Sequence, residues 1–321
     1  MAHKKNIVSR VLSRLKLSVG NSIANQTHDD LISASVLSLE ETKLRIGALH
    51  AALMKVNPPA TFHDAEFTVF SQFGEDGIIQ HLIRNVPGIP STFIEFGVQD
   101  YTEANTRFLL QHNNWKGLIL DASEASMRGL RRKHMYWRHD ITAVSAFIDR
   151  DNINSLIASN GFSGEIGILS IDIDGNDYWV WERVTVVDPI IVIVEYNSVF
   201  GASRAVTIPY DAGFERTKAH FSNLYWGCSL KALCLLAERK GYIFVGSNSA
   251  GNNAFFVRKD RSTAFRALSA DEGYVCSRIR DARDIDGNLT FESGLARLKA
   301  IGDMSVFDVE ADRTMQLSEI S

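Results

Sequence analysis

The feature that most constrains the fold is a regular alternation of strand-like and helix-like segments between Phe67 and about Lys259. The strand-like segments are short and apolar: Ser91–Val98, Lys116–Asp121, a weaker Tyr136–Ile141, Ile166–Ile173 and Pro189–Glu195. Strands buried on both faces of a parallel sheet have this composition. Helical patterns lie between them, for example at Glu103–His112 and Ser145–Asn160. The alternation predicts a doubly wound, mostly parallel α/β sheet.

The end of this region departs from the alternation. An amphipathic helix at Ser229–Lys240 is followed by two strand-like segments, Gly241–Val245 and Asn253–Arg258, with a turn-rich loop between them. A parallel crossover needs a dozen or more residues, so two strands this close must pair antiparallel. We therefore expect a seven-stranded sheet that ends in an antiparallel hairpin.

Polar residues stand where the strands are expected to end, and ligands of open α/β sheets bind beyond those ends. Gly97 allows a ligand to approach the backbone closely, and a helix expected near Thr102 points free N–H groups at the same place. Glu95 either accepts hydrogen bonds from a ligand's ammonium group or pairs with a local arginine. Asp121, 24 residues after Gly97, is placed to bind two ribose hydroxyls, and Asp140 is expected beside an adenine amino group.

The fourth and fifth strands carry an acidic cluster. Asp172 and Asp174 stand at the end of the fourth strand, with Asp177 three residues after Asp174, and Glu195 and Asn197 stand at the end of the fifth. Side chains two apart share one side of a strand. Three interpretations are open: a Mg²⁺ or Mn²⁺ site formed by Asp172, Asp174, Glu195 and Asn197, a metal-free site with Asp174 or Glu195 as general base, or a purely structural turn. His220, in a segment long enough to cover the site, is a second candidate base or an incidental loop histidine.

Residues 1–57 are expected to form a helical extension. Basic residues and apolar residues alternate at helical spacing near the start, between Lys4 and Lys16, with no acidic residue before Asp29. This segment is a solvated helix, a helix on an anionic membrane surface or partner, or a targeting peptide. In residues 29–56, apolar residues recur every seven positions from Ile32 to Leu53, which suits packing on the body of the protein or a homodimer.

Composition limits the class of protein. The formal net charge is −4, which argues against a general nucleic-acid binder because such proteins are normally basic. The three cysteines lack the short spacing of a zinc or redox motif, as expected of a reduced cytoplasmic protein. Residues 261–321 are polar, and we expect a tail that packs on the domain or is partly disordered.

Several blocks of the chain resemble FkbM-type methyltransferases, a branch of the class I enzymes that use S-adenosylmethionine (SAM). The blocks are Ser71–Gly77, Phe93–Gly97 with Asn105 and Thr106, Ser170–Tyr178, Glu195–Asn197 and Gly251–Phe256. The resemblance spans about residues 67–259, and we expect the SAM-dependent methyltransferase domain at 58–260. The antiparallel hairpin agrees, since it separates class I methyltransferases from nicotinamide-binding Rossmann domains.

The resemblance implies O-methyl transfer to a hydroxyl of a sugar, a glycosylated metabolite or a surface glycan. It implies a SAM site lined by Gln72, Glu95, Gly97, Asn105, Asp121, Asp140 and Asp172, to which we add Tyr101 and Ser123. In the metal-free interpretation Asp172 holds the sulfonium end of SAM. Tyr196, Tyr225 and Trp226 either stack on a sugar ring or pack in the core. Two alternatives remain: an inactive domain that binds a partner, and a nicotinamide-dependent oxidoreductase or epimerase, although the chain lacks a G-x-G-x-x-G turn.

Overall fold

The structure is a computed structural model that describes residues 35–320. The chain separates into two compact units, Met1–Leu49 and His50–Ser321. In the first unit the described residues, 35–49, are helical, and the helix continues to residue 56 before Pro58 and Pro59. The basic segment Lys4–Lys16 and the expected helix start near Asp29 lie outside the described residues. Leu39, Ile46 and Leu53 are exposed on the helix, and the homodimer through residues 29–56 stays a prediction.

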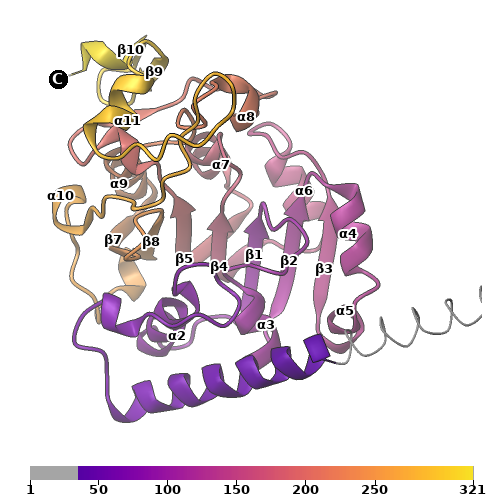
Figure 1. The fold of residues 1–321 in the computed structure, drawn as a ribbon. Coiled ribbons are helices and arrows are strands. Elements are labelled where there is room, and N and C mark those ends of the chain that lie inside the picture. The colour runs from indigo at the N-terminus through magenta and orange to yellow at the C-terminus, as the bar shows by residue number, and fades with distance from the viewer. Residues whose placement is uncertain (1–34, 321) are drawn as a thin grey trace, which may run out of the picture. The chain divides into compact units, whose positions relative to one another are not determined.

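The second unit contains a seven-stranded sheet in the order β3-β2-β1-β4-β5-β8-β7 (Figure 1). Neighbours among β1 to β5 pair parallel, whereas β8 is antiparallel to both β5 and β7. This arrangement confirms the predicted doubly wound, mostly parallel seven-stranded sheet and its terminal antiparallel hairpin. The strands are β1 Thr92–Phe96, β2 Lys116–Asp121, β3 Ile141–Ser145, β4 Gly164–Ile171, β5 Val187–Glu195, β7 Tyr242–Ser247 and β8 Asn253–Arg258.

Helices cover both faces of the sheet, because alternate residues of each strand point to opposite sides. One buried cluster joins Ile94 and Phe96 of β1 to three helices: α6 Ile153–Ser159, α7 Asp177–Arg183 and α9 Leu230–Lys240. The other joins Phe93 of β1 to four helices: α2 Glu75–Asn85, α3 Arg107–His112, α4 Glu124–Leu130 and α5 His134–Arg138.

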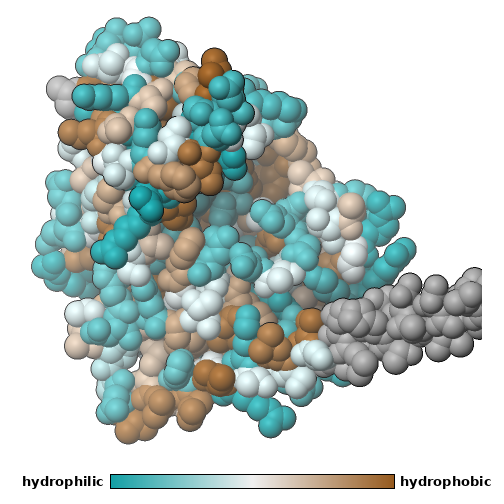
Figure 2. All heavy atoms as spheres, viewed as in Figure 1, coloured by the Kyte–Doolittle hydropathy of each residue, from teal (hydrophilic) through white to brown (hydrophobic). Residues whose placement is uncertain are grey.

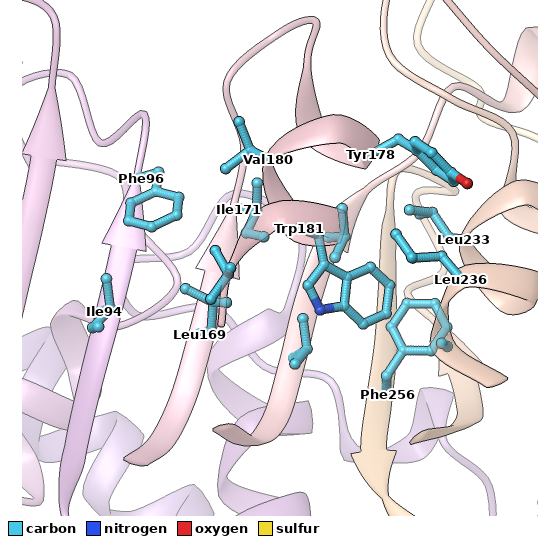
Figure 3. Packing of buried hydrophobic residues seen from close by; sticks show 14 of the residues in the cluster. Ile94, Phe96, Leu169, Ile171, Tyr178, Val180, Trp181, Leu233, Leu236 and Phe256 are labelled. Carbon is cyan, nitrogen blue, oxygen red and sulfur yellow. The ribbon is translucent and has the colours of Figure 1, made fainter. Parts of the chain in front are cut away.

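Trp181 on α7 is the largest fully buried side chain of the first cluster. It lies among Leu169 of β4, Phe256 of β8 and Leu233 of α9 (Figure 3), and its ring centroid is 5.0 Å from that of Phe256. Trp181 therefore holds α7 to the sheet next to the acidic cluster at the start of this helix.

The predicted third strand is wrong. Residues 134–138 form α5, and β3 begins only at Ile141. Met135 of α5 is buried in the same cluster as Leu130 of α4. Its apolar side chain therefore packs a helix on the sheet and does not indicate a strand. The helices predicted at Glu103–His112 and Ser145–Asn160 are shorter than expected, because α3 starts at Arg107 and α6 at Ile153.

The C-terminal residues form a second small sheet in the order β10-β9-β6. Its central strand β9, Ser305–Asp308, pairs with β10, Arg313–Gln316, and with β6, Val206–Thr207, which lies between β5 and α9 in the chain. Three short helices accompany it: α8 Arg216–Ala219, α10 Ala270–Gly273 and α11 Leu295–Ala300. A third buried cluster, which includes Phe200, Leu224 and Val306, fills the space between these elements. In Figure 1, β9, β10, α8 and α11 lie beyond the carboxyl ends of the strands of the large sheet, whereas α10 lies beside β7 and α9.

The four 3-10 turns of the second unit are η1 His63–Ala65, η2 Ser198–Phe200, η3 Lys259–Arg261 and η4 Leu317–Glu319. Within the described residues, no helix has the length and apolar character needed to cross a membrane. On the face shown in Figure 2, polar and apolar side chains of the second unit are interspersed.

Candidate functional site

Three adjoining cavities open at the carboxyl edge of the sheet. The first, of about 240 Å³, is lined by Gln72, Glu95 and the segment from Gly97 to Asn105. The second, of about 180 Å³, is lined by Asp121, Phe147, Ile148, Asn176 and Phe214. These two share Gly97, Gln99 and Asp172. The third, of about 250 Å³, is lined by Glu195, Arg216 and Trp226 and shares Gln72 with the first.

Gly97 is required where the first two cavities meet. Its φ is +73°, and a Cβ atom there would lie 1.6 Å from the backbone oxygen of Asp172. No side chain fits between β1 and the end of β4, so the backbone itself forms the wall of both cavities. The close neighbour is the backbone of Asp172, and the ligand approach that the sequence predicted at Gly97 stays a prediction.

Glu95 lies at the base of the first cavity. Its carboxylate accepts hydrogen bonds from the backbone N–H groups of Asn105, at 2.8 Å, and Thr106, at 3.1 Å, and from the Thr106 hydroxyl. The partners are therefore the turn before α3, not the local arginine considered as an alternative. Burial raises the pKa of Glu95 to about 7, against the lowering effect of these hydrogen bonds.

Asp121 ends β2 and lines the second cavity. One carboxylate oxygen accepts from the Gln99 N–H and the other from the Ser123 N–H, both at 2.7 Å. Ser123 itself caps α4 by accepting from the Ser126 N–H, and it is not among the residues that line the cavities. Asp121 thus fixes the turn after β1 and keeps its place at the mouth of the second cavity.

Asp140 does not lie where the sequence placed it. Because β3 starts at Ile141, Asp140 precedes the strand, and its carbonyl accepts from the N–H of Gly117 near the start of β2. It therefore lies at the amino edge of the sheet, opposite the cavities. The residues that follow β3 are Ala146, Phe147 and Ile148, and these line the second cavity instead.

Three other predicted cofactor residues have mixed outcomes. Tyr101 is fully buried in the core with a φ of +61°, and its hydroxyl hydrogen-bonds that of Thr106 at 2.9 Å. It therefore stabilises the turn and does not line the first cavity. Asn105 and Gln72 do line it; the Asn105 amide donates to the Ser170 hydroxyl and the Gln72 amide donates to Glu103.

The acidic cluster forms as predicted at the ends of β4 and β5. Asp172, Asp174 and Glu195 each place a carboxylate oxygen within 4.8 Å of the others. Burial, followed by mutual repulsion, raises the pKa values of Asp172 and Glu195 well above their usual range. Glu195 is 8% exposed, and its Oε2 atom is buried without a hydrogen-bond partner. Both carboxyls therefore bind a proton more readily than exposed carboxyls do.

Asp177 has a different role from these three residues. Its carboxylate accepts from the backbone N–H groups of Ile173, at 2.9 Å, and Gly175, at 3.0 Å. It is fully buried, and burial raises its pKa to about 6. Asp177 closes the turn that carries Asp174, so the structural interpretation holds for this member of the motif.

Arg216 is a site residue that the sequence analysis missed. From α8 it forms ion pairs with Asp174, at 2.9 Å, and Asp281, at 2.6 Å, and its guanidinium lies 4.6 Å from the centre of the Trp226 ring. A basic residue in the segment expected to cover an acidic cluster was the available signal. Asp281, from the C-terminal segment, had none.

His220, chosen as a candidate base from that same segment, is not brought to the site. Its ring hydrogen-bonds the Ser222 hydroxyl at 2.7 Å, and it is not among the residues lining the three cavities. Burial lowers its pKa. The structure supports an incidental loop histidine.

Asn197 lines the third cavity, but its amide is occupied. The nitrogen donates to the carbonyls of Leu224, at 2.8 Å, and Trp226, at 3.0 Å, and the oxygen accepts from the Val199 N–H. Asn197 therefore anchors the loop that presents Trp226 and does not offer a metal ligand. Tyr196 and Trp226 both line the third cavity, whereas Tyr225 does not. Tyr196 is fully buried, and its hydroxyl donates to the Val275 carbonyl.

Two of the motif blocks are joined through Glu75, which the sequence analysis did not select. Its Oε1 atom accepts from the side-chain amides of Asn248, at 2.7 Å, and Asn253, at 2.9 Å. The block before α2 is thereby tied to the hairpin, and Glu75 and Asn253 both line the first cavity. A glutamate inside an expected helix start gave no reason to expect a contact 173 residues away.

The chain was compared with known proteins. No family model matches it, and no curated protein matches its sequence. Among solved structures, the chain is similar to the N-terminal domain of EvdMO1 with SAH bound, at 10% identity and a TM-score of 0.38, covering 60% of this chain and 81% of that one. It is also similar to an O-methyltransferase from Bacillus cereus in complex with SAH, at 14% identity and a TM-score of 0.37, covering 68% and 89%.

A third neighbour is an S-adenosylmethionine-dependent methyltransferase from Clostridium acetobutylicum, at 10% identity and a TM-score of 0.37, covering 57% of this chain and 90% of that one. Likeness at this level does not define an activity, so we rest the function on the site.

Proposed function

We propose that the protein is a SAM-dependent methyltransferase that transfers a methyl group to a hydroxyl of a sugar or glycosylated acceptor. One observation carries the proposal: two cavities meet over the bare backbone of Gly97, at the carboxyl edge of a sheet that ends in an antiparallel hairpin. Asp121 borders one cavity and Glu95 the other. A ligand with a hydroxylated ring at one end and an ammonium group at the other suits this pair.

The residues present fit SAM. Asp121 is placed to accept hydrogen bonds from ribose hydroxyls, and Phe147 and Ile148 offer apolar surface to the adenine in the second cavity. Glu95, Asn105 and Gln72 surround the first cavity, which would take the amino-acid end. The chemistry supplied by bound SAM is a methyl group on a positively charged sulfur, which becomes a neutral thioether once the methyl has left.

The third cavity would hold the acceptor. Trp226 presents an aromatic ring there, and Asp172 and Glu195 lie at the boundary with the SAM cavities. With raised pKa values for both carboxyls, the pair is suited to take the hydroxyl proton as the oxygen is methylated. Arg216 holds Asp174 beside them through its ion pair. The main task of these residues is to align the acceptor hydroxyl with the methyl group, which lowers the entropic part of the barrier.

A metal-assisted variant of the same reaction uses Asp172, Asp174 and Glu195 as ligands. Their oxygens lie within 4.8 Å of one another, and the unpartnered Oε2 of Glu195 adds a free lone pair. A divalent cation there would lower the pKa of an acceptor hydroxyl. The ion pair from Arg216 to Asp174 already supplies a positive charge, so we favour the metal-free form.

The sugar acceptor and the FkbM-type branch are part of the proposal and rest on the motif blocks described above. The net charge of −4 supports an acceptor other than nucleic acid. We also propose that the protein is cytoplasmic and that its basic N-terminal segment contacts a membrane surface or a partner. This segment lies outside the described residues.

The first test is calorimetric titration of the full chain with SAM, S-adenosylhomocysteine (SAH) and NADH, each with EDTA or with Mg²⁺. Micromolar binding of SAM and SAH but not of NADH supports the proposal. Binding of NADH alone moves the protein to the oxidoreductase alternative. No binding of any of the three, in a chain whose circular dichroism shows it to be folded, favours the inactive partner-binding alternative.

A further inference from the structure

A group of three arginines lies next to the proposed acceptor cavity. A cleft of about 660 Å³ is lined by Arg278, Arg280 and Arg297 together with residues such as Ser277, Ser293 and Tyr274. We call it the basic cleft. Its described lining residues include no carboxylate. The cleft therefore concentrates positive charge without an internal counterion, which is the electrostatic signature of an anion site.

Arg297 is the residue that makes the cleft more than a charged surface. It is 4% exposed, and its Nη atoms donate to the backbone carbonyls of Ile279, at 3.2 Å, and Ser277, at 3.0 Å. Its Nε atom is buried with no hydrogen-bond partner. Within residues 35–320 no carboxylate forms an ion pair with it. A buried guanidinium without an anion is costly, and a bound anion would offset that cost.

Arg278 and Arg280 precede α11 in the chain and are exposed. Arg280 packs over the Phe291 ring at 5.6 Å, and neither arginine forms an ion pair with a described carboxylate. A planar guanidinium group donates two parallel hydrogen bonds to two oxygens of one phosphate. Three such groups around one cleft match the charge of a phosphate or diphosphate better than that of a single carboxylate.

The basic cleft adjoins the proposed acceptor cavity, because Ser277 and Arg297 line both. The acceptor cavity in turn holds Glu195 and Arg216. One extended ligand would therefore reach from the carboxylate pair to the arginines.

We infer that the acceptor is an anionic sugar derivative whose phosphate or diphosphate group binds in the basic cleft while its sugar occupies the third cavity. The inference deepens the proposed function and rests on it for the identity of the third cavity. The phosphate group has two possible sources, a nucleoside diphosphate and a lipid-linked diphosphate, with the same charge chemistry.

The test is calorimetric titration of the SAH-saturated full chain with inorganic pyrophosphate in metal-free buffer of fixed ionic strength. We compare the native chain with the double variant Arg278→Ala/Arg280→Ala, and with Arg297→Gln. The matched control is Arg128→Ala/Arg132→Ala, which removes two exposed arginines from the region of α4, outside the cleft. We expect at least a tenfold weaker dissociation constant in the cleft variants and a change below twofold in the control.

Equal weakening in the control and cleft variants, or no pyrophosphate binding by the native chain, overturns the inference. Because Arg297 is buried, the result for Arg297→Gln counts only if thermal denaturation shows that this variant is folded. If it is not folded, the double variant Arg278→Ala/Arg280→Ala decides whether pyrophosphate binds in the basic cleft. SAH titrations run without pyrophosphate separate the two proposals. Failure to bind SAH removes the methyltransferase function, whereas SAH binding with no effect of the arginines removes only the basic cleft.

The two sources are separated with UDP and geranyl diphosphate as probes. Tighter binding of UDP than of pyrophosphate assigns a nucleotide-linked sugar, and tighter binding of geranyl diphosphate assigns a lipid-linked one. Equal affinities support the phosphate class with no contribution from the remainder of the carrier.

Discussion

At the scale of single residues, Asp121 combines a structural and a binding role. Its carboxylate already accepts two backbone hydrogen bonds at 2.7 Å, and the proposal adds the ribose. A hydrogen bond to a charged group contributes about 1.5–3 kcal/mol, and each 1.4 kcal/mol is about tenfold in affinity. We expect Asp121→Ala to weaken SAH binding by about 10- to 100-fold in calorimetry.

Asp140→Ala is the matched control, since both aspartates were predicted to bind the cofactor and the structure places them at opposite edges of the sheet. Asp140 lies at the start of β3, at the opposite edge of the sheet. Its variant should bind SAH like the native chain. An effect of Asp140→Ala as large as that of Asp121→Ala would contradict the placement of the cofactor at the carboxyl edge.

Gly97 carries a second residue-scale prediction. A Cβ at 1.6 Å from the Asp172 carbonyl oxygen, at a φ of +73°, cannot be accommodated without moving the end of β4. Gly97→Ala should therefore destabilise the protein by about 2 kcal/mol or more in urea denaturation and impair SAH binding.

The control for Gly97 is Gly129→Ala on α4, where nothing lies within 4 Å of an added Cβ. Alanine is preferred to glycine in a helix interior by about 0.5–1 kcal/mol, so this variant should be neutral or more stable than the native chain. Comparable loss of stability in both variants would contradict the close approach of β1 and β4.

At the scale of elements, the packing of α7 depends on Trp181, which is 1% exposed among residues of β4, β8 and α9 (Figure 3). Truncation of a buried tryptophan costs about 3–5 kcal/mol, so Trp181→Ala should lower the free energy of unfolding by that amount. Trp137, on α5, is 69% exposed, and Trp137→Ala should change the unfolding free energy by about 0.5 kcal/mol or less. Urea titrations of the two variants check this, and similar midpoints for both would count against it.

The elements that the sequence predicted well are those whose local pattern and burial agree. β2 and β8 have the predicted bounds, and the hairpin follows from connection length alone. The prediction of the third strand failed because the apolar side chains of Met135 and Tyr136 pack a helix, α5, against the sheet. The small sheet could not be predicted, because β6 has two residues and its partner β9 lies about a hundred residues later.

The same limit applies to the site. Residues that end strands, such as Asp121 and Glu195, could be placed from topology. Asp281 and Arg297 reach the site through tertiary packing of short segments whose local sequence carries no signal. Arg216 had one signal, its place in the segment expected to cover the acidic cluster. Asp140 was misplaced only because the strand before it was misplaced.

At the scale of the whole molecule, several buried carboxyls have raised pKa values: Glu95 to about 7, and Asp76 and Asp177 to about 6, mainly through burial. Between the unfolded values and these values the folded state binds more protons than the unfolded state, so the free energy of unfolding falls as pH rises. We expect urea titrations to show stability decreasing from about pH 4 to about pH 7.

Glu95→Gln isolates one contribution, because an amide does not titrate. A shift from 4.5 to about 7 corresponds to on the order of 3 kcal/mol at about 1.4 kcal/mol per pK unit, so this variant should lose less stability over the same range. Glu238→Gln, an exposed position on α9, should keep the native pH dependence. If the unfolding free energy of Glu95→Gln depended on pH in the same way as that of the native chain, the raised pKa of Glu95 would be contradicted.

The cavities are lined by different parts of the chain, and this has an evolutionary consequence. The first two are walled mainly by the ends of β1 to β4, which also build the core, whereas the third cavity and the basic cleft draw on α8, α11 and the segment from Val275 to Arg297. Mutations in those segments can alter the molecule that is recognised without disturbing the sheet. Under the proposed function, descendants of such a chain would accept a different acceptor molecule and keep the same methyl donor.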